Sequence, residues 1–269
     1  MKKVIFSISV MLCSMGAFAQ SNSSDVFQIG TSQWADVDQD GLLNVAKIRQ
    51  GVLPGQSAAS NNNYSEIDQD GARNNAFTSQ SNLFNDAYQE QIGSDNQATI
   101  WQDQLVPNVS TGYDFADQQQ HGDNNKATVD QGTSGNNPLP STPVFSAAAV
   151  AFSNAVPVPV SPHGDNDAYQ HQDDDYGIAY VSQGGKRNYS RQYQNGSASI
   201  TAATANESNH YQYGNDNDAI SVQWGKDLTV NSLQIGNDNY TKATQMGTGH
   251  NSVNVQVGNS NYITVLQND

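Results

Sequence analysis

The acidic run from Asp36 to Gly41 is the first stretch whose side chains could bind an ion, because its carboxylates alternate with other residues. A calcium loop of the twelve-residue type begins in this way. It also needs a bidentate acid at its twelfth position, and that position is Lys47 here. We therefore predict no calcium loop at this run. Weak binding of calcium by the acidic surface stays an open alternative.

The histidines are the other candidate ligands, and they are scattered along the chain at His121, His163, His171, His210 and His250. None is spaced from a cysteine or a carboxylate as metal ligands usually are. No local signature of a Ser-His-Asp triad is present. The neighbouring acids Asp173, Asp174 and Asp175 suit a solvated surface better than acid–base catalysis. We predict no catalytic residue, no cofactor and no metal ligand, so the chain is expected not to be an enzyme.

Composition narrows the function further. The 269 residues carry a net charge of −15, with only 11 Lys and Arg. Nucleic acid is therefore not an expected partner, because binding it needs a basic face that displaces counterions from phosphates. Only 14% of the residues are charged and 36% are hydrophobic, which fits neither a disordered polyelectrolyte nor an ordinary apolar core. Polar low complexity and a hydrogen-bonded repeat fold remain.

The N-terminus reads as a targeting device. Lys2 and Lys3 precede the apolar run 4–18, and Ala17-Phe18-Ala19 forms a small-residue cleavage site. This pattern predicts a secretory signal peptide over residues 1–19, followed by a short N-terminal segment, 20–27. The mature chain would then contain no cysteine and no membrane span, and we expect it to be secreted or held at the cell surface.

A strict repeat decides between the two structural options. From Gln212 onward glutamines recur every 11 residues (223 − 212 = 11), in the template Q-x-G-x-x-N-x-A-x-x-x-Q. The template can be followed from residue 28 to 269. Four units are stretched near their start, at the turn, and the longest insertion, about 133–162, is rich in proline. If two units form one turn of a coil, three of the four insertions leave from the same edge.

The template also predicts the local structure. Its Asn, Ala, often apolar and closing Gln positions are two residues apart, so in a strand they share one face. Gly and the Asx residues that follow supply the turn. We therefore expect an all-β fold, a β-solenoid or β-helix of 11-residue strand-turn half-repeats with about 22 residues per rung. Rungs would stack in an amyloid-like way about 4.8 Å apart, and stacked amides would satisfy one another.

The outward face shows two further patterns. Its aromatic residues suit either cross-strand packing or adhesion to a sugar or protein; they are Trp34, Phe77, Tyr88, Trp101, Tyr169, Tyr180, Tyr189, Tyr193 and Tyr240. Toward the C-terminus the outward residues become more apolar, which predicts a place where another subunit packs; they are Ile220, Val222, Leu233, Val253, Val255 and Leu266. No capping helix is expected after the last unit, so an uncapped strand edge would template another chain.

The repeated unit, with Gly, Asn, Ala and Gln at fixed offsets, resembles the curlin repeat of bacterial curli fibres. The resemblance covers nearly all of the mature chain and implies a fimbria-like functional amyloid, exported through an outer-membrane pore and assembled with another curlin-type subunit. Nearly every half-repeat here carries the Asn form, which is closer to the minor, nucleating subunit. The stacking ladder implied by the resemblance comprises Gln91, Asn96, Gln120, Asn125, Gln212, Asn217, Gln234, Asn239, Gln256, Asn261 and Gln267.

Three functions compete at this stage. The first is an exported subunit that polymerises into extracellular fibres and supports cell adhesion and biofilm matrix. The second is a monomeric β-solenoid adhesin that binds a glycan or a host protein through its aromatic face or its Pro-rich loop. The third, a solenoid enzyme, would need converging acids or a Lys or Arg in a groove, and the outward positions predict no such cluster. The role as major or nucleating subunit stays open.

Overall fold

A computed structural model describes residues 21–51, 61–102, 112–132, 164–196 and 201–269. Every regular element in these ranges is a β-strand, and the strands form two parallel sheets of nine strands each. The predicted all-β class is therefore confirmed, and the paired sheets are consistent with a β-solenoid. The predicted signal peptide (1–19) and the Pro-rich insertion (133–162) lie outside the described residues.

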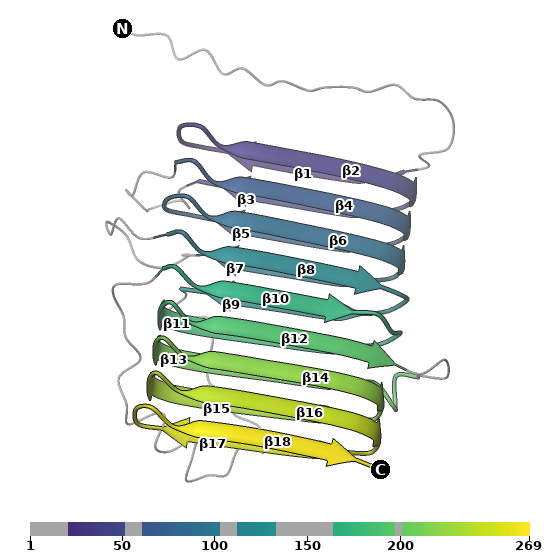
Figure 1. Ribbon diagram of the computed structural model, residues 1–269. Helices are drawn as coiled ribbons and strands as arrows, with labels where there is room; N and C mark the ends of the chain where they lie inside the picture. The colour runs from purple at the N-terminus through teal and green to yellow at the C-terminus, as the bar shows by residue number, and fades with distance from the viewer. Residues whose placement is uncertain (1–20, 52–60, 103–111, 133–163, 197–200) are drawn as a thin grey trace, which may run out of the picture.

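The chain alternates between the two sheets, so that strands of odd number form one and strands of even number form the other. The odd sheet contains β1 (Ser23–Gln28), β3 (Val45–Gln50), β5 (Asn75–Gln80), β7 (Gln97–Gln102), β9 (Lys126–Gln131), β11 (Ile178–Lys186), β13 (Glu207–Asn215), β15 (Thr229–Asn237) and β17 (Asn251–Val257). The even sheet contains β2 (Trp34–Leu42), β4 (Tyr64–Ala72), β6 (Asp86–Ser94), β8 (Phe115–His121), β10 (Asp167–Gln172), β12 (Tyr189–Gly196), β14 (Asp218–Lys226), β16 (Tyr240–Thr248) and β18 (Tyr262–Asn268). Figure 1 shows the strands stacked in chain order, from β1 and β2 at one end to β17 and β18 at the other.

Pairing is in register throughout, so that each glutamine lies beside the glutamine of the next strand. Gln223 of β14 pairs with Gln245 of β16, 22 positions later. Gln120 of β8 pairs with Gln172 of β10, 52 positions later. Three of the four undescribed stretches after β2 follow β3, β7 and β9 of the odd sheet, and the fourth follows β12 of the even sheet. The register therefore resumes after every interruption.

The core lies between the two sheets and is built from small residues. Burial alternates along each strand, as β7 illustrates: Ala98 and Ile100 are buried, whereas their neighbours Gln97 and Thr99 are not. One buried cluster combines residues of both sheets, namely Ala87, Ile100, Ala116, Val129, Ala168 and Val181. Alternating side chains point to opposite faces of a sheet, so the inward set follows directly from the template.

Glycine closes the turn between strands. Gly214 has φ of +126°, and a Cβ on it would overlap the carbonyl oxygen of Gly236 in the adjacent turn. Asp216, two residues later, also has positive φ, at 57°. Aspartate tolerates this left-handed conformation better than most residues do. The Gly-x-Asx order of the template thus meets two separate demands of the turn.

Two details differ from the expectation. β1 lies mostly within residues 20–27, which we set apart from the solenoid; its Ser24, Val26 and Gln28 occupy the inward positions of a half-repeat and pair with β3. Leu233 was expected as an outward contact for another subunit, but it is only 1% exposed and packs with Tyr211, Tyr213 and Ile235. It cannot offer a docking surface. Leu266 is 68% exposed and stays available.

Candidate functional site

A column of buried glutamines runs along the inner face of the even sheet. Gln91 donates from Nε2 to Oε1 of Gln120 at 2.8 Å, and Gln120 donates in the same way to Gln172 at 2.9 Å. All three side chains are fully buried. Each amide is both donor and acceptor, so one residue type repeated in register satisfies itself along the stack. The last bond of this column joins Gln245 to Gln267 at 2.7 Å.

The odd sheet carries a matching column. Gln212 donates to Gln234 at 2.9 Å, and Gln234 donates to Gln256 at 2.9 Å. The second N–H of the amide bonds the main chain on the opposite side of the rung, since Gln234 also reaches the carbonyl oxygen of Asp218 at 2.8 Å. The glutamine columns therefore tie neighbouring strands together and also tie one sheet to the other. Buried amides with all their bonds made are stabilising and specify the register.

The asparagines act mainly on the main chain, in contrast to the amide pairing expected from the sequence. The backbone N–H of Asn125 donates to Oδ1 of Asn96 at 2.9 Å. Asn217 accepts in the same way from Asn239 at 3.2 Å, and its Nδ2 donates to the carbonyl oxygen of Gly236 at 2.9 Å. The shorter side chain of asparagine lies at the turn, where unpaired backbone groups are within its reach. Asn261 continues this column by bonding Asn239.

One turn departs from this pattern. Gly177 occupies an Asn position, and its N–H donates to Oδ1 of Asn125 at 2.7 Å. The carboxyl group of Asp174 fills the space above Gly177, where it accepts from Nδ2 of Asn206 at 3.0 Å. Burial raises the pKa of Asp174 to about 7. An acid three residues earlier thus replaces the missing amide and carries the column onward.

A third glutamine column was not predicted. Gln89 donates to Gln118, Gln118 to Gln170, and Gln170 to Gln192, each at 2.8 Å and each between buried residues. These residues stand two positions before the repeating glutamine, where the template expects an apolar side chain. The signal was present in the sequence as Q-x-Q in four half-repeats of the even sheet. Its meaning depended on those half-repeats being neighbours in one sheet.

Both ends of the stack are open among the described residues. β1 and β2 are the outer strands at one end, and β17 and β18 are the outer strands at the other. Val26 continues the apolar column of Ile48, yet it is 46% exposed whereas Ile48 is fully buried. An unpaired strand edge is a template for another chain. Each end therefore presents an unfinished core beside unpaired main-chain groups.

The outer face of the even sheet carries a ladder of aromatic rings. Successive ring centroids lie 5.2 to 6.4 Å apart. The six rings are Trp34, Tyr64, Tyr88, Phe115, Tyr169 and Tyr189. Offset and tilted aromatic pairs at these distances stabilise a sheet beyond the area they bury. The bland role of cross-strand packing is therefore met in full by this geometry.

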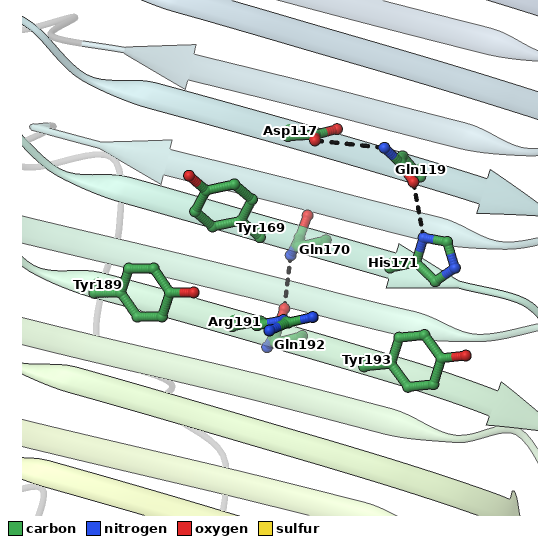
Figure 2. Close-up of a pocket in the computed structure, with 9 residues that line it drawn as sticks. All are labelled: Asp117, Gln119, Tyr169, Gln170, His171, Tyr189, Arg191, Gln192 and Tyr193. Atoms are coloured by element: carbon green, nitrogen blue, oxygen red, sulfur yellow. Dashed lines mark hydrogen bonds between the residues drawn. The ribbon is translucent and has the colours of Figure 1, made fainter.

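A pocket opens over the C-terminal part of this ladder. Figure 2 shows Tyr169, Tyr189 and Tyr193 around Arg191, with His171 at the edge. Phenol rings and a guanidinium group in one depression can stack against a sugar ring and donate hydrogen bonds to its hydroxyls. The pocket is thus the feature that an adhesin would use.

Two histidines that appear unrelated in the sequence meet on this face. His121 and His171 stand on the neighbouring strands β8 and β10, and both contact the carboxylate of Asp173. The spacing argument failed here because it considered ligands close in the sequence. In a parallel stack, ligands come from equivalent positions on neighbouring strands.

No helix in the described part of the chain is long and apolar enough to cross a membrane. No family model, no curated protein and no solved structure matches this chain.

Proposed function

We propose that this chain is an exported structural subunit of the curlin-repeat type, which stacks end to end into extracellular amyloid-like fibres that support cell adhesion and biofilm matrix. In this proposal one rung comprises two strand-turn half-repeats of about 22 residues. The observation that carries it is the complementarity of the two open ends. The ends match in hydrogen-bonding polarity, in register and in the residues they leave exposed.

The glutamine columns have a direction. Each Nε2 donates toward the C-terminal strand, so Gln28 and Gln39 receive no bond at Oε1 from another glutamine at the N-terminal end. At the other end, Gln256 and Gln267 bond only main-chain carbonyls through Nε2 and keep a second N–H. A second copy stacked head to tail supplies each end with the partner it lacks. Head-to-tail contacts that do not close produce open filaments.

The inner columns also continue across such a junction. Ile263 and Val265 of β18 would lie beside Ala35 and Val37 of β2, and all four are only partly buried in the single chain. Strands β17 and β18 would pair with β1 and β2 of the next copy. Joining them buries apolar surface and forms two rows of main-chain hydrogen bonds at about 4.8 Å.

The cellular context belongs to the same proposal. The pattern of residues 1–19 supports export, and the likeness to curlin repeats supports an outer-membrane export pore and another curlin-type subunit as partners. The strong Asn form of the half-repeats favours a nucleating role.

Fibre growth of the purified mature chain tests the proposal. We expect thioflavin-positive fibres with a 4.7–4.8 Å reflection. A variant with Val26→Lys and Val265→Lys should stay monomeric, because inward charges at both ends oppose stacking. Thr99→Lys, on the outer face of a central strand, is the matched control and should polymerise. A wild-type chain that stays monomeric at high concentration contradicts the proposal.

The pocket at Tyr169, Tyr189 and Arg191 favours a second candidate, a monomeric adhesin that binds a glycan or a host protein. Replacing Tyr169 and Tyr189 by Ala should then abolish retention on immobilised polysaccharide, and deleting residues 133–160 tests the Pro-rich insertion in the same assay. Fibre growth that survives both changes, with no effect on adhesion, removes this candidate.

A further inference from the structure

Three polar side chains on the outer face of the even sheet converge at the ends of β8 and β10. His121 follows Gln120, and Asp173 follows Gln172, the glutamine that pairs with Gln120. His171 lies one position before Gln172. The register thus places His121 beside Asp173, and the ligand atoms that these three side chains offer all lie within 4.8 Å of one another.

The contacts within the cluster centre on the carboxylate. Oδ2 of Asp173 lies 2.8 Å from Nε2 of His171, and Oδ1 lies 3.2 Å from Nδ1 of His121. Ligands around a tetrahedral ion with bonds of about 2.0–2.1 Å stand about 3.3 Å apart. All three residues are partly buried rather than fully enclosed. The side chains can therefore close around an ion by small rotations, and an open position remains for water.

Each imidazole also has a partner on its other nitrogen. Nδ1 of His171 lies 2.9 Å from Oε1 of Gln119, an oxygen that can only accept. This bond makes Nδ1 the protonated nitrogen of the neutral ring and leaves the lone pair on Nε2 facing Asp173. On His121, Nε2 lies 3.6 Å from Oε2 of Glu90, on the side of the ring away from Asp173. Oxygen atoms behind ligating histidines orient the ring in this way in many metal sites.

We propose that His121, His171 and Asp173 bind one divalent transition-metal ion, with Zn²⁺ as the best match. Two imidazoles and one carboxylate suit this class of ion, whereas Ca²⁺ and Mg²⁺ prefer oxygen ligands. The nearby column of Asp38, Asp68 and Glu90 offers carboxylates alone, and it serves as the internal contrast. The site does not depend on fibre formation.

The position of the site gives it a structural effect. His121 and Asp173 are 52 residues apart and stand on adjacent strands, with the longest insertion between β9 and β10. A metal ion that joins them closes a long loop of chain, and the unfolded chain holds no preformed site. Binding therefore stabilises the stack where the chain leaves it for longest.

Equilibrium dialysis of the full mature chain against Zn²⁺, with excess Ca²⁺ to occupy carboxylates, tests the proposal in monomer or fibre alike. We expect one tightly bound Zn²⁺ per chain and none in His171→Asn or His121→Asn. His250→Asn, at a lone histidine–carboxylate pair, is the matched control and should keep full binding. Wild-type chain that binds no Zn²⁺ above the level of the two variants overturns the proposal.

A second variant separates ligation from folding. Gln119→Leu removes only the group behind His171, and it should weaken Zn²⁺ binding about 10–100-fold while the circular dichroism of the metal-free chain stays unchanged. Co²⁺ should give the visible bands of a four-coordinate ion with wild type. Zn²⁺ should raise the melting temperature of wild type and of His250→Asn alone. Unchanged affinity in Gln119→Leu, or six-coordinate Co²⁺, contradicts the geometry proposed.

Discussion

Gln120 donates a hydrogen bond of 2.9 Å to Gln172, although 52 residues separate them and the longest insertion lies between their strands. The bond lies in a fully buried column that runs through the even sheet. The insertion is thus accommodated without a break in the amide column. The repeating unit, rather than the length of chain between units, determines which residues meet.

Removing one amide from this column should be costly. We expect Gln120→Ala to lower the free energy of unfolding by about 3 kcal/mol, because Nε2 of Gln91 and Oε1 of Gln172 both lose their partner in a buried site. Gln97→Ala, at an exposed position of β7, should change it by less than about 0.5 kcal/mol. Urea unfolding followed by circular dichroism measures both. Equal effects of the two substitutions would show that the column contributes nothing.

The turn glycines give a second test. Gly214→Ala should destabilise the chain by about 3 kcal/mol or more, because its φ is +126° and the added Cβ would overlap the main chain of Gly236. Gly249 has φ of +75°, but the nearest atom to its added Cβ is Oδ2 of Asp227 at 3.8 Å. Gly249→Ala should therefore cost only about 1 kcal/mol. Thermal unfolding of the two variants distinguishes strain alone from strain with overlap.

His210 predicts a dependence of stability on pH. It is fully buried, its Nδ1 lies 2.8 Å from Oγ of Ser190, and burial lowers its pKa from 6.5 to about 3. Between these values the unfolded chain binds a proton that the folded chain does not, so stability is present above pH 6.5 and is lost as the pH falls. From pH 7.5 to 5, wild type should lose about 2 kcal/mol more than His210→Gln.

The comparison with His210→Gln is needed because other groups titrate in the same window. Burial raises the pKa of Asp174 to about 7, which acts in the opposite direction. The difference between the two chains cancels such shared contributions. Parallel stability curves for wild type and His210→Gln from pH 7.5 to 5 would contradict a buried neutral histidine.

Head-to-tail stacking predicts that a chain blocked at one end terminates growth. Val26→Lys alone leaves β17 and β18 intact, so this variant can join the N-terminal end of a fibre and then present a blocked end. Substoichiometric Val26→Lys should therefore slow elongation of wild-type fibres, whereas the variant blocked at both Val26 and Val265 should not. Elongation from seeds, followed by thioflavin fluorescence, measures the effect. Equal inhibition by the two variants would contradict polar stacking.

Several features follow from the sequence because they depend on local periodicity. The spacing of Asn96, Ala98, Ile100 and Gln102 predicts one inward face, and β7 buries these four residues. The all-β class is confirmed for the same reason. Turn chemistry was equally local, since Gly214 and Asp216 were expected where positive φ occurs.

Other features could not be read from one unit. The column Gln89–Gln118–Gln170–Gln192 and the meeting of His121 with His171 depend on which units are neighbours in one sheet. Leu233 is buried although its position in the strand points it away from the core. The sequence assigns each of these residues a face, but not the residues that lie beside it or above it.

The sequence by itself determined the strands, the turns and the inward amides, because the 11-residue period fixes the side of the strand on which each side chain lies. Only the tertiary structure decided which residues meet across strands, since parallel pairing in register joins positions 22 to 52 residues apart. That pairing turns repeated amides into continuous columns with a direction. It also brings two distant histidines onto one carboxylate, where spacing along the chain gave no sign of a site.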